Sequence, residues 1–151
     1  MPAPDTSALA RRLLSGDRWA AAAGAKLVEL REGYARATLR LRPVHLNGVG
    51  VAQGGAVFTL ADFAFAAAAN SHGTVAVALD TSITFARAAT RGVLTAEARE
   101  ESLSRRVSVC NVRVTSEDGA VVALFRGTAF RKDETLAAAA AARGAARARR
   151  A

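Results

Sequence analysis

Cysteine, aromatic residues and long apolar runs are all scarce in this chain of 151 residues. The single cysteine, Cys110, excludes an intrachain disulfide framework and a cysteine-rich zinc site. Aromatic residues make up 5% of the chain, so its 38 alanines must supply much of the core through close packing. A membrane-spanning helix needs about 20 consecutive apolar residues, whereas the uncharged run at 63–79 is interrupted by the polar sequence NSHG. The opening sequence, MPAPDTSALARRLLSGD, has no long apolar segment, so we expect no secretory signal and a cytoplasmic location.

Lysine is also rare, since 19 of the 21 basic residues are arginines, and with 13 acidic residues the net charge is +8. Four of the arginines lie in residues 137–151, an alanine-rich tail whose removal would leave a net charge of +4. The tail would form a frayed basic helix or a solvated extension, or it would contact phosphates or a partner. The sequence has no helix-turn-helix pattern, zinc finger or aromatic RNA-binding motif, so we expect neither nucleic acid nor a membrane as partner.

The first part of the chain has patterns typical of helices followed by a hairpin. Residues 7–22 predict a short helix or a helix pair. The side chains expected to dock this segment on the core are Leu9, Leu13 and Trp19. Residues 25–31 and 34–42 predict two strands joined at Glu32-Gly33, because apolar and polar residues alternate on either side of a turn signal.

A long apolar helix is predicted at 56–69, after a glycine-bearing loop at 43–53. The helix is apolar nearly all round, so we expect it to be buried. Four further strands, joined by short links that predict an antiparallel meander, are expected at 74–88, 92–103, 106–116 and 120–132. The sequence therefore predicts an α+β fold in which a sheet of about six strands wraps around one helix.

Asp62 is the one charged residue between Pro43 and Leu79, and it lies in the middle of the predicted buried helix. Aspartate is a mediocre helix former, and an unpaired buried carboxylate is costly. The residue is about two turns into the helix, too far from the start for an N-cap. Two interpretations stay open. Asp62 points outward or pairs with an arginine to stabilise the fold, or it is a catalytic carboxylate.

Residues without bulky side chains and residues with amide groups precede this helix. Gly54 and Gly55 would let a ligand approach backbone N–H groups at the positive end of the helix dipole, as in an oxyanion hole. The plainer interpretation of the glycine pair is a tight turn. Gln53 and Asn47 add side-chain amides nearby. Donors for a carbonyl oxygen together with one carboxylate, Asp62, indicate acyl transfer or hydrolysis that needs no metal or cofactor.

The two histidines and the cysteine are weaker candidates. His45 and His72 are 27 residues apart without a local cysteine or glutamate, so we expect surface or loop histidines rather than metal ligands. Cys110 lies in the apolar sequence VSVCNV, which favours a packed thiol over a nucleophile.

The stretch 45–73, HLNGVGVAQGGAVFTLADFAFAAAANSHG, resembles the phenylacetic acid degradation (PaaI) group of hotdog-fold acyl-coenzyme A (acyl-CoA) thioesterases. The likeness continues through LDTSITFARAA at 79–89, SLSRRVSV at 102–109 and ALFRGTAFR at 123–131. The order of the motifs matches over about residues 20–132. The resemblance implies a hotdog domain at 25–132, in which an antiparallel sheet wraps around the central helix. A helical segment at 1–24 would precede this domain and the basic tail at 133–151 would follow it.

The resemblance also implies roles for the residues around the helix. Asp62 matches the aspartate that serves as nucleophile or general base, and the amide of Gly54 would hold the thioester carbonyl from the other subunit. Asn47 matches the loop asparagine. The group usually has histidine where this chain has Gln53, which can donate a hydrogen bond but cannot titrate near neutral pH. The family forms homodimers with composite sites, often paired into homotetramers, and takes coenzyme A as part of the substrate with no other cofactor.

The remaining expected contacts involve the substrate itself. Gly55 would contribute backbone to the site, and Thr81 or Ser82 would supply the hydroxyl that related enzymes place on the strand facing the aspartate, although Ala78 also fits the matching place. The phosphates of coenzyme A would meet residues near turns and strand ends. These are Arg87, Ser104, Arg105, Arg106, Arg131 and Lys132.

Three functions follow in order of preference. The first is an aryl-acyl (phenylacetyl-type) or medium-chain acyl-CoA thioesterase. The second is a non-catalytic hotdog protein that binds acyl-CoA, an alternative left open by Gln53. The third is a module that binds nucleic acid or a protein partner through the tail.

Overall fold

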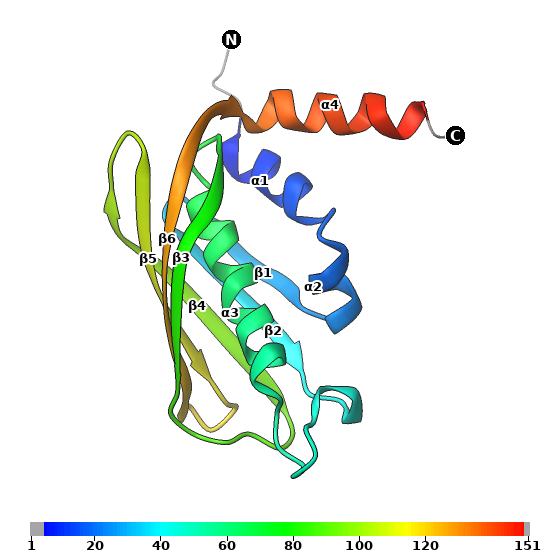
Figure 1. The fold of residues 1–151 in the computed structure, drawn as a ribbon, viewed down its shortest axis with the longest axis vertical. Helices are drawn as coiled ribbons and strands as arrows, with labels where there is room; N and C mark the ends of the chain where they lie inside the picture. Colours follow the sequence, from blue (N-terminus) through cyan, green and yellow to red (C-terminus); the bar gives the residue numbers. More distant parts are fainter. Residues whose placement is uncertain (1–4, 150–151) are drawn as a thin grey trace.

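The computed structural model describes residues 5–149. It contains the six expected strands, which form where apolar and polar residues alternate along the chain. The strands are β1 (Lys26–Arg31), β2 (Tyr34–Arg40), β3 (Thr74–Phe85), β4 (Val93–Leu103), β5 (Val107–Thr115) and β6 (Val121–Thr135). They form one curved antiparallel sheet in the order β1-β2-β4-β5-β6-β3 (Figure 1). The α+β hotdog prediction is thereby confirmed.

The predicted four-strand meander is wrong at one strand. β4, β5 and β6 follow one another as antiparallel neighbours, but β3 lies at the far edge of the sheet and pairs with β6. β3 ends at Phe85 rather than at residue 88, so the link to β4 runs over residues 86–92 and is long enough to reach a different part of the sheet. The hairpin at Glu32-Gly33 is as predicted, and Gly33 has a positive φ of 68° that suits glycine.

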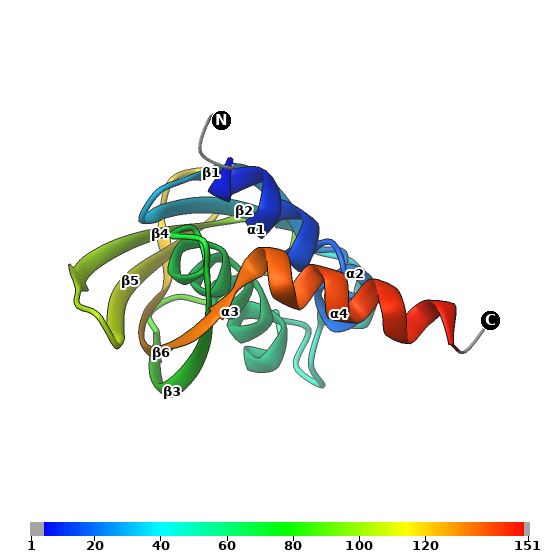
Figure 2. The same cartoon turned by 90° about the horizontal axis from the view of Figure 1, so that it is seen from above.

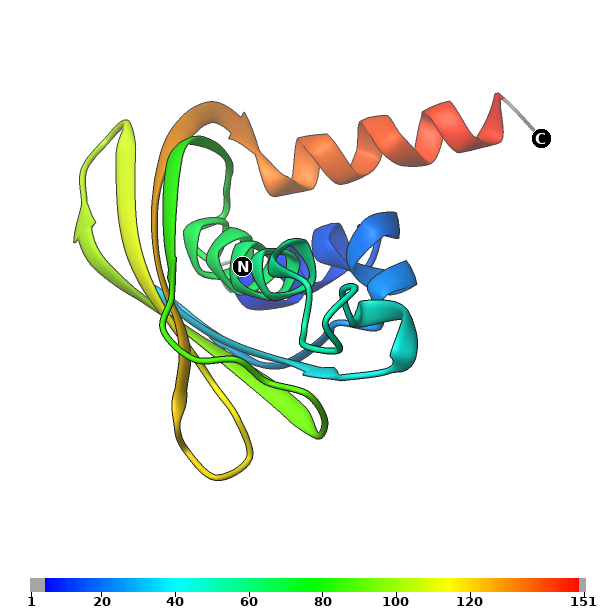
Figure 3. The same ribbon diagram turned by 60° about the horizontal axis from the view of Figure 1, so that its bottom comes forward.

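The central helix, α3 (Gly54–Ala69), lies in the hollow of the sheet, and Figure 3 looks nearly along it. It begins two residues before the predicted start. Its buried side chains are small or apolar, which allows the sheet to wrap closely. A Cβ on Gly127 of β6 would lie 2.7 Å from the ring of Phe65, so glycine is needed where helix and sheet are closest.

Two short helices, α1 (Thr6–Leu14) and α2 (Arg18–Ala23), confirm the predicted helix pair. Each begins at an aspartate whose carboxylate accepts backbone N–H bonds, Asp5 for α1 and Asp17 for α2. Leu9 and Leu13 pack partly buried against the core, as expected. Trp19 stays 73% exposed, although its indole Nε1 donates to the hydroxyl of Thr59 in α3, so it contacts the central helix without being buried.

The basic tail forms a helix, α4 (Leu136–Ala148), which directly follows β6. Leu136 is fully buried, and the guanidinium of Arg143 donates to the carbonyl oxygen of Leu13 in α1 at 3.3 Å. Beyond this contact the helix projects from the body, and residues 141–149 are all exposed (Figure 2). None of the helices in residues 5–149 is long and apolar enough to cross a membrane.

One edge of the sheet, β3, is both long and apolar. It pairs with β6 on one side, and within the described part of the chain its other side has no strand partner. Three of its large apolar side chains are exposed: Val77 by 41%, Leu79 by 63% and Phe85 by 53%. An open edge of this kind readily pairs with another strand.

Candidate active site

The loop before α3 is folded around Asn47. A short 3-10 turn, η1 (Pro43–His45), precedes it. The side-chain oxygen of Asn47 accepts hydrogen bonds from the N–H groups of Val49 at 3.0 Å and Val51 at 3.2 Å. This oxygen therefore shapes the loop, and among residues 5–149 nothing accepts a hydrogen bond from the Nδ2 group. The amide nitrogen of Asn47 is the part left to donate to a ligand.

Gln53 is the N-cap of α3. Its backbone N–H donates to the carbonyl oxygen of His45 at 2.8 Å, and its side-chain Oε1 accepts from the N–H of Ala56 at 3.2 Å. A Cβ on Gly55 would lie 2.7 Å from that Oε1 atom, so a side chain there would require the capping amide to move. With the oxygen used in capping, the Nε2 group of Gln53 is left as a donor.

The first N–H groups of α3 are open. Neither Gly54 nor Gly55 has an acceptor for its backbone N–H in the part of the chain that the structure describes. Such groups have no partner within the helix and lie at its positive end. Two free donors side by side meet the chemical requirement of an oxyanion hole.

Asp62 lies half-buried in the middle of α3. In the described residues, no donor bonds its carboxylate and no arginine pairs with it. Burial raises the pKa of Asp62 above the ordinary aspartate value of 3.8, and the negative charge of Asp17 raises it further. An uncompensated carboxylate with a raised pKa has the properties of a general base or a nucleophile.

The two halves of this candidate site are far apart within one chain. Gly54 and Asp62 are eight residues apart on the same helix, which at about 1.5 Å per residue places them about 12 Å apart along the axis. Hydrogen bonding and attack on one carbonyl group both need distances of about 3 Å. A single chain therefore does not bring its own Gly54 and Asp62 to one carbonyl.

The register of β3 separates the hydroxyl candidates. Thr81 pairs with Gly127 and shares the face of the sheet that contacts α3, as does Ala78 through its pairing with the buried Ala129. Ser82 pairs with Arg126 and lies on the opposite face. Thr81, and not Ser82, therefore lies on the face of the sheet that contacts α3, the helix that carries Asp62.

Two cavities flank the start of α3. The first, of about 730 Å³, lies between α2, η1 and α3 and includes Trp19, Val44, Gly55 and Phe58 in its lining. None of the residues that line it is an aspartate, glutamate, lysine or arginine. The second, of about 470 Å³, lies toward the end of β3 and is lined by Gly54, Phe85 and Arg87, among others. A ligand bound at Gly54 and Gly55 would face an uncharged cavity on one side and a cavity with one arginine, Arg87, on the other.

Three of the expected phosphate contacts lie in the turn between β4 and β5, near the other end of α3. Arg131 ties this turn to the start of β3, because it donates to the carbonyl oxygen of Ser104 at 2.7 Å and to Thr74 at 3.5 Å. Arg106 is engaged by Asp133 at 2.9 Å. Arg105 is exposed, and its side chain makes no ion pair with any described residue. The β4–β5 turn and the first turn of α3 lie toward opposite ends of the molecule (Figure 1).

His45 lies in the loop before α3, which is one of the two predicted alternatives. It is buried, with 5% exposed, and contributes contacts that the sequence did not indicate. Its Nδ1 accepts the N–H of Arg42 at 2.9 Å and its Nε2 lies 2.8 Å from the carbonyl oxygen of Ala23, so the ring is a neutral Nε2–H tautomer. His45 thus links the end of α2 to the N-cap of α3. Sequence offers one signal for this role, a histidine two residues before the asparagine of the loop.

His72, Glu100 and Cys110 form a hydrogen-bonded cluster with Ser108 near the C-terminal end of α3. The ring of His72 bonds Glu100 at 2.8 Å, Glu100 accepts from Ser108 at 2.6 Å, and Ser108 lies 3.7 Å from the thiol of Cys110. Cys110 is fully buried, which raises its pKa to about 11. Residues 5–149 contain no group of three or more histidine, cysteine, aspartate or glutamate side chains able to hold a metal ion.

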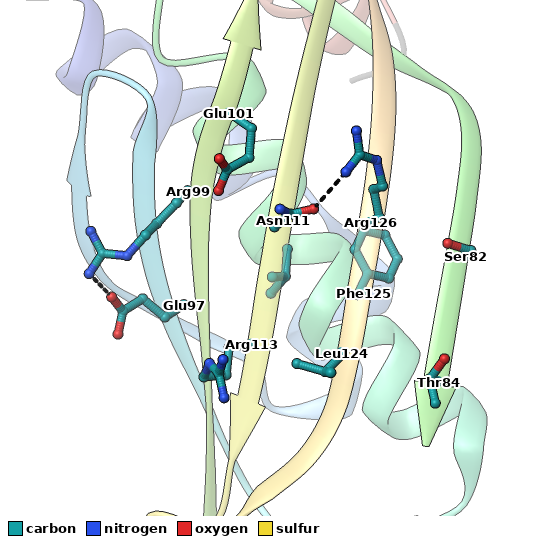
Figure 4. Close-up of a pocket in the computed structure, with 11 residues that line it drawn as sticks. Ser82, Thr84, Glu97, Arg99, Glu101, Asn111, Arg113, Leu124, Phe125 and Arg126 are labelled. Atoms are coloured by element: carbon teal, nitrogen blue, oxygen red, sulfur yellow. Dashed lines mark hydrogen bonds and ion pairs between the residues drawn. The ribbon is translucent and has the colours of Figure 1, made fainter. Parts of the chain in front are cut away.

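A further cavity of about 740 Å³ lies on the outer face of the sheet (Figure 4). Two of its arginines have partners, Arg99 with Glu97 and Arg126 with Asn111, whereas Glu101 and Arg113 have none among the described residues. Of the expected site residues, only Ser82 lines it. The sheet separates this cavity from α3, so it is not part of the candidate active site.

Comparison with known proteins places this arrangement in a family. Residues 49–123 match the family model of the thioesterase superfamily. A putative esterase of Archaeoglobus fulgidus is 40% identical over 73% of this chain and 72% of that protein. The acyl-coenzyme A thioesterase PaaI of Escherichia coli is 35% identical over 84% of this chain and 91% of its own length.

Solved structures agree. The structure of Escherichia coli PaaI superimposes with a TM-score of 0.82 and 34% identity, covering 86% of this chain and 98% of that one. A hypothetical thioesterase of Streptococcus pneumoniae, solved with coenzyme A, has a TM-score of 0.70 and 28% identity, covering 74% of this chain and 88% of that one. The chain belongs to the thioesterase superfamily, and it is a thioester hydrolase of the PaaI type.

Proposed function

We propose that this protein hydrolyses acyl-CoA thioesters, with an aryl-acyl or medium-chain acyl group, to a free acid and coenzyme A. The observation that carries the proposal is the pair of open N–H groups at Gly54 and Gly55 on the same helix as the unpaired carboxylate of Asp62. The similarity to an acyl-CoA thioesterase and to a thioesterase solved with coenzyme A supports the choice of thioester.

In the proposed reaction the N–H of Gly54 donates to the thioester carbonyl oxygen and stabilises the negative charge that develops there. The Nε2 group of Gln53 and the Nδ2 group of Asn47 are further donors. Asp62 takes a proton from water, the resulting hydroxide attacks the carbonyl carbon, and the C–S bond breaks as the thiolate leaves and is protonated. No metal or additional cofactor takes part.

Asp62 has a second possible role as the attacking group. Its carboxylate would form a mixed anhydride with the acyl group, and water would then hydrolyse that anhydride. A single turnover in oxygen-18 water tests the anhydride route, because Asp62 gains label only if water attacks the aspartyl carbonyl of an anhydride. Hydroxylamine, which traps an anhydride at either carbonyl, covers attack at the acyl carbonyl. Absence of both label and trapped product would favour the general-base route.

The proposed active unit is a dimer. A second copy related by a two-fold axis, joined at the exposed β3 edge, would reverse the direction of α3 and bring Asp62 of one chain toward Gly54 of the other. The same reversal would bring Arg105 and Arg106 of one chain toward the coenzyme A bound at the other, while Arg87 lies beside Gly54 in its own chain. Pairing of dimers into a tetramer is the expected further assembly.

The proposal is tested by thiol release from a panel of acyl-CoA esters, with the wild type compared with Asp62→Asn. General-base catalysis contributes about 10²- to 10⁴-fold, so the variant should lose turnover by at least that factor while it keeps its fold and its affinity for acyl-CoA. Full activity in the variant would remove Asp62 from the mechanism. Binding of acyl-CoA by a wild type that releases no thiol would favour a non-catalytic acyl-CoA-binding protein.

A further inference from the structure

The single tryptophan of the chain stands beside the open end of α3. Trp19 is 73% exposed, an unusual cost for the largest apolar side chain. Its position is nevertheless fixed, because the indole Nε1 donates to the hydroxyl of Thr59 in α3 at 2.9 Å. Thr59 itself is buried, with 9% exposed. The polar end of the indole is thus satisfied, and its flat apolar surface is left uncovered at the wall of the 730 Å³ cavity.

Hydrogen bonds tie the wall that carries Trp19 to the loop before α3. At the C-terminal end of α2, the guanidinium of Arg42 donates to the carbonyl oxygen of Ala23 at 3.1 Å, and His45 bonds the same oxygen at 2.8 Å. The carbonyl oxygen of His45 accepts the N–H of Gln53, which caps α3. The cavity wall and the oxyanion donors are therefore one connected unit, which is the condition for a preorganised binding surface.

Charge decides which part of a thioester substrate enters this cavity. Coenzyme A carries several phosphate charges, and the side of the helix start that offers an arginine is the one with Arg87. The Trp19 cavity has no charged side chain in its lining, and its one histidine, His45, has a neutral ring. With the carbonyl oxygen at Gly54, the acyl group points toward Trp19 and the coenzyme A portion toward Arg87.

We propose that Trp19 is the specificity-determining residue for the acyl group, and that it selects flat aromatic acyl groups by stacking them on its indole, with Thr59 as its positioning residue. The inference rests on the proposed function, since it concerns the same site. Offset stacking of two rings adds to the burial of their area. A saturated ring of the same size buries a similar area without stacking, so the two kinds of acyl group report separately on stacking and on fit.

The test compares phenylacetyl-CoA with cyclohexylacetyl-CoA, whose rings differ in flatness but little in size. The wild type should favour the aromatic ester, and in Trp19→Leu the ratio of the two kcat/KM values should fall about 3- to 10-fold. Acetyl-CoA, too small to reach the indole, should change less than about twofold. Thr59→Val, which keeps the shape but removes the acceptor, should give a smaller change of the same sign.

Val28→Ala is the matched control, because Val28 is an exposed apolar residue on β1, away from the cavity. It should leave the ratio unchanged. An unchanged ratio in a folded, active Trp19→Leu would overturn the proposal, and so would an equal loss for acetyl-CoA, which would indicate a general structural role.

A second readout is independent of turnover. Trp19 is the only tryptophan, so its fluorescence reports directly on its surroundings. Phenylacetyl-CoA added to Asp62→Asn should quench or shift the emission, whereas coenzyme A alone should not. If the wild type releases no thiol but phenylacetyl-CoA changes the emission, the hydrolase proposal fails and the acyl site stands. If neither ester nor coenzyme A changes the emission, the acyl site is refuted whatever the activity.

Discussion

The two ends of α3 use their polar groups in opposite ways. At the C-terminal end, the side chain of Asn70 donates to the carbonyl oxygens of Ala66 at 2.9 Å and Ala76 at 3.1 Å, and it accepts the N–H of Ala76 at 2.9 Å. At the N-terminal end, the N–H groups of Gly54 and Gly55 have no acceptor among the described residues. The polar groups at the C-terminal end are hydrogen-bonded within the fold, whereas the two N–H groups at the N-terminal end are open to a ligand.

The surroundings of the two ends differ in the same way. Next to Asn70, the hydroxyl of Ser71 accepts the N–H of Gly33 at 2.8 Å and donates to the carbonyl oxygen of Ala68, and it is fully buried. The N-terminal end instead opens into two cavities. Polar groups that lack partners therefore point to a functional site, whereas hydrogen-bonded ones are explained by stability alone.

Removal of one open donor at the start of α3 should have the largest effect. Gly54→Pro deletes the N–H, and proline suits the first position of a helix, while the extended backbone of Gln53 tolerates a following proline. Loss of one oxyanion donor should lower kcat about 10²- to 10³-fold. Steady-state thiol release measures this.

Gly54→Ala is the control, because it keeps the N–H and requires the half-exposed Phe85 ring, 3.0 Å from the added Cβ, to shift slightly. A mixture of Gly54→Pro and Asp62→Asn chains also tests the composite site. Each mixed dimer would contain one intact site, so an equal mixture should recover about a quarter of wild-type activity. No recovery after subunit exchange, with mixed dimers present, would contradict a site shared between chains.

At the closed end, Asn70→Ala should affect stability and not catalysis. The substitution leaves the N–H and the carbonyl of Ala76 without their partner, which should cost about 2–3 kcal/mol in the free energy of unfolding. Urea unfolding measures the loss, and kcat should stay within about twofold. Asn111→Ala, the same change at an exposed position, is the control and should cost less than about 0.5 kcal/mol. A large fall in kcat without loss of stability would place the closed end in the mechanism.

A pH series on Asp62 should show a moderate effect. The pKa of Asp62 is raised in the folded state, so between pH 3.8 and the folded-state pKa the folded protein binds more protons than the unfolded chain. The free energy of unfolding therefore falls as pH rises through this window. Asp62→Asn removes this loss, so the variant should be more stable than the wild type at neutral pH, and the difference should shrink below the window. Wild-type kcat/KM should fall as acidification protonates the carboxylate. Parallel stability curves for the two proteins at every pH would argue against the raised pKa.

The smallest expected effect is at Cys110, beside the closed end. With a pKa of about 11, about one thiol in a thousand is ionised at pH 8, and the side chain is fully buried. A thiol reagent should therefore not label the folded protein, and it should label one group per chain in denaturant. Rapid labelling of the folded protein, with activity intact, would show that this region opens.

Much of the fold was predictable because local periodicity determined it. The alternation in residues 34–42 predicted β2, and the apolar run before Asn70 predicted α3. The place of β3 was not predictable from its own pattern, because pairing with β6 rather than β4 is decided by contacts distant in sequence.

The site shows the same division. Asp62, Gly54 and Gln53 stood out because a lone charge, a glycine pair and an amide are visible in the sequence. The exposure of Trp19 and the burial of His45 were not, since both depend on how α2 is tied to α3. Ser82 was indistinguishable from Thr81 until the register of β3 was known.

The position of Trp19 has a consequence for how such a protein diversifies. The residues matched by the superfamily model, 49–123, include the helix with Asp62, whereas α2 lies outside them. The wall that faces the proposed acyl group therefore comes from a segment outside the superfamily match. Sequence changes on the exposed face of this short helix would alter the proposed acyl preference. Changes at its C-terminal end would also reach the N-cap of α3, because His45 bonds both Ala23 and Gln53.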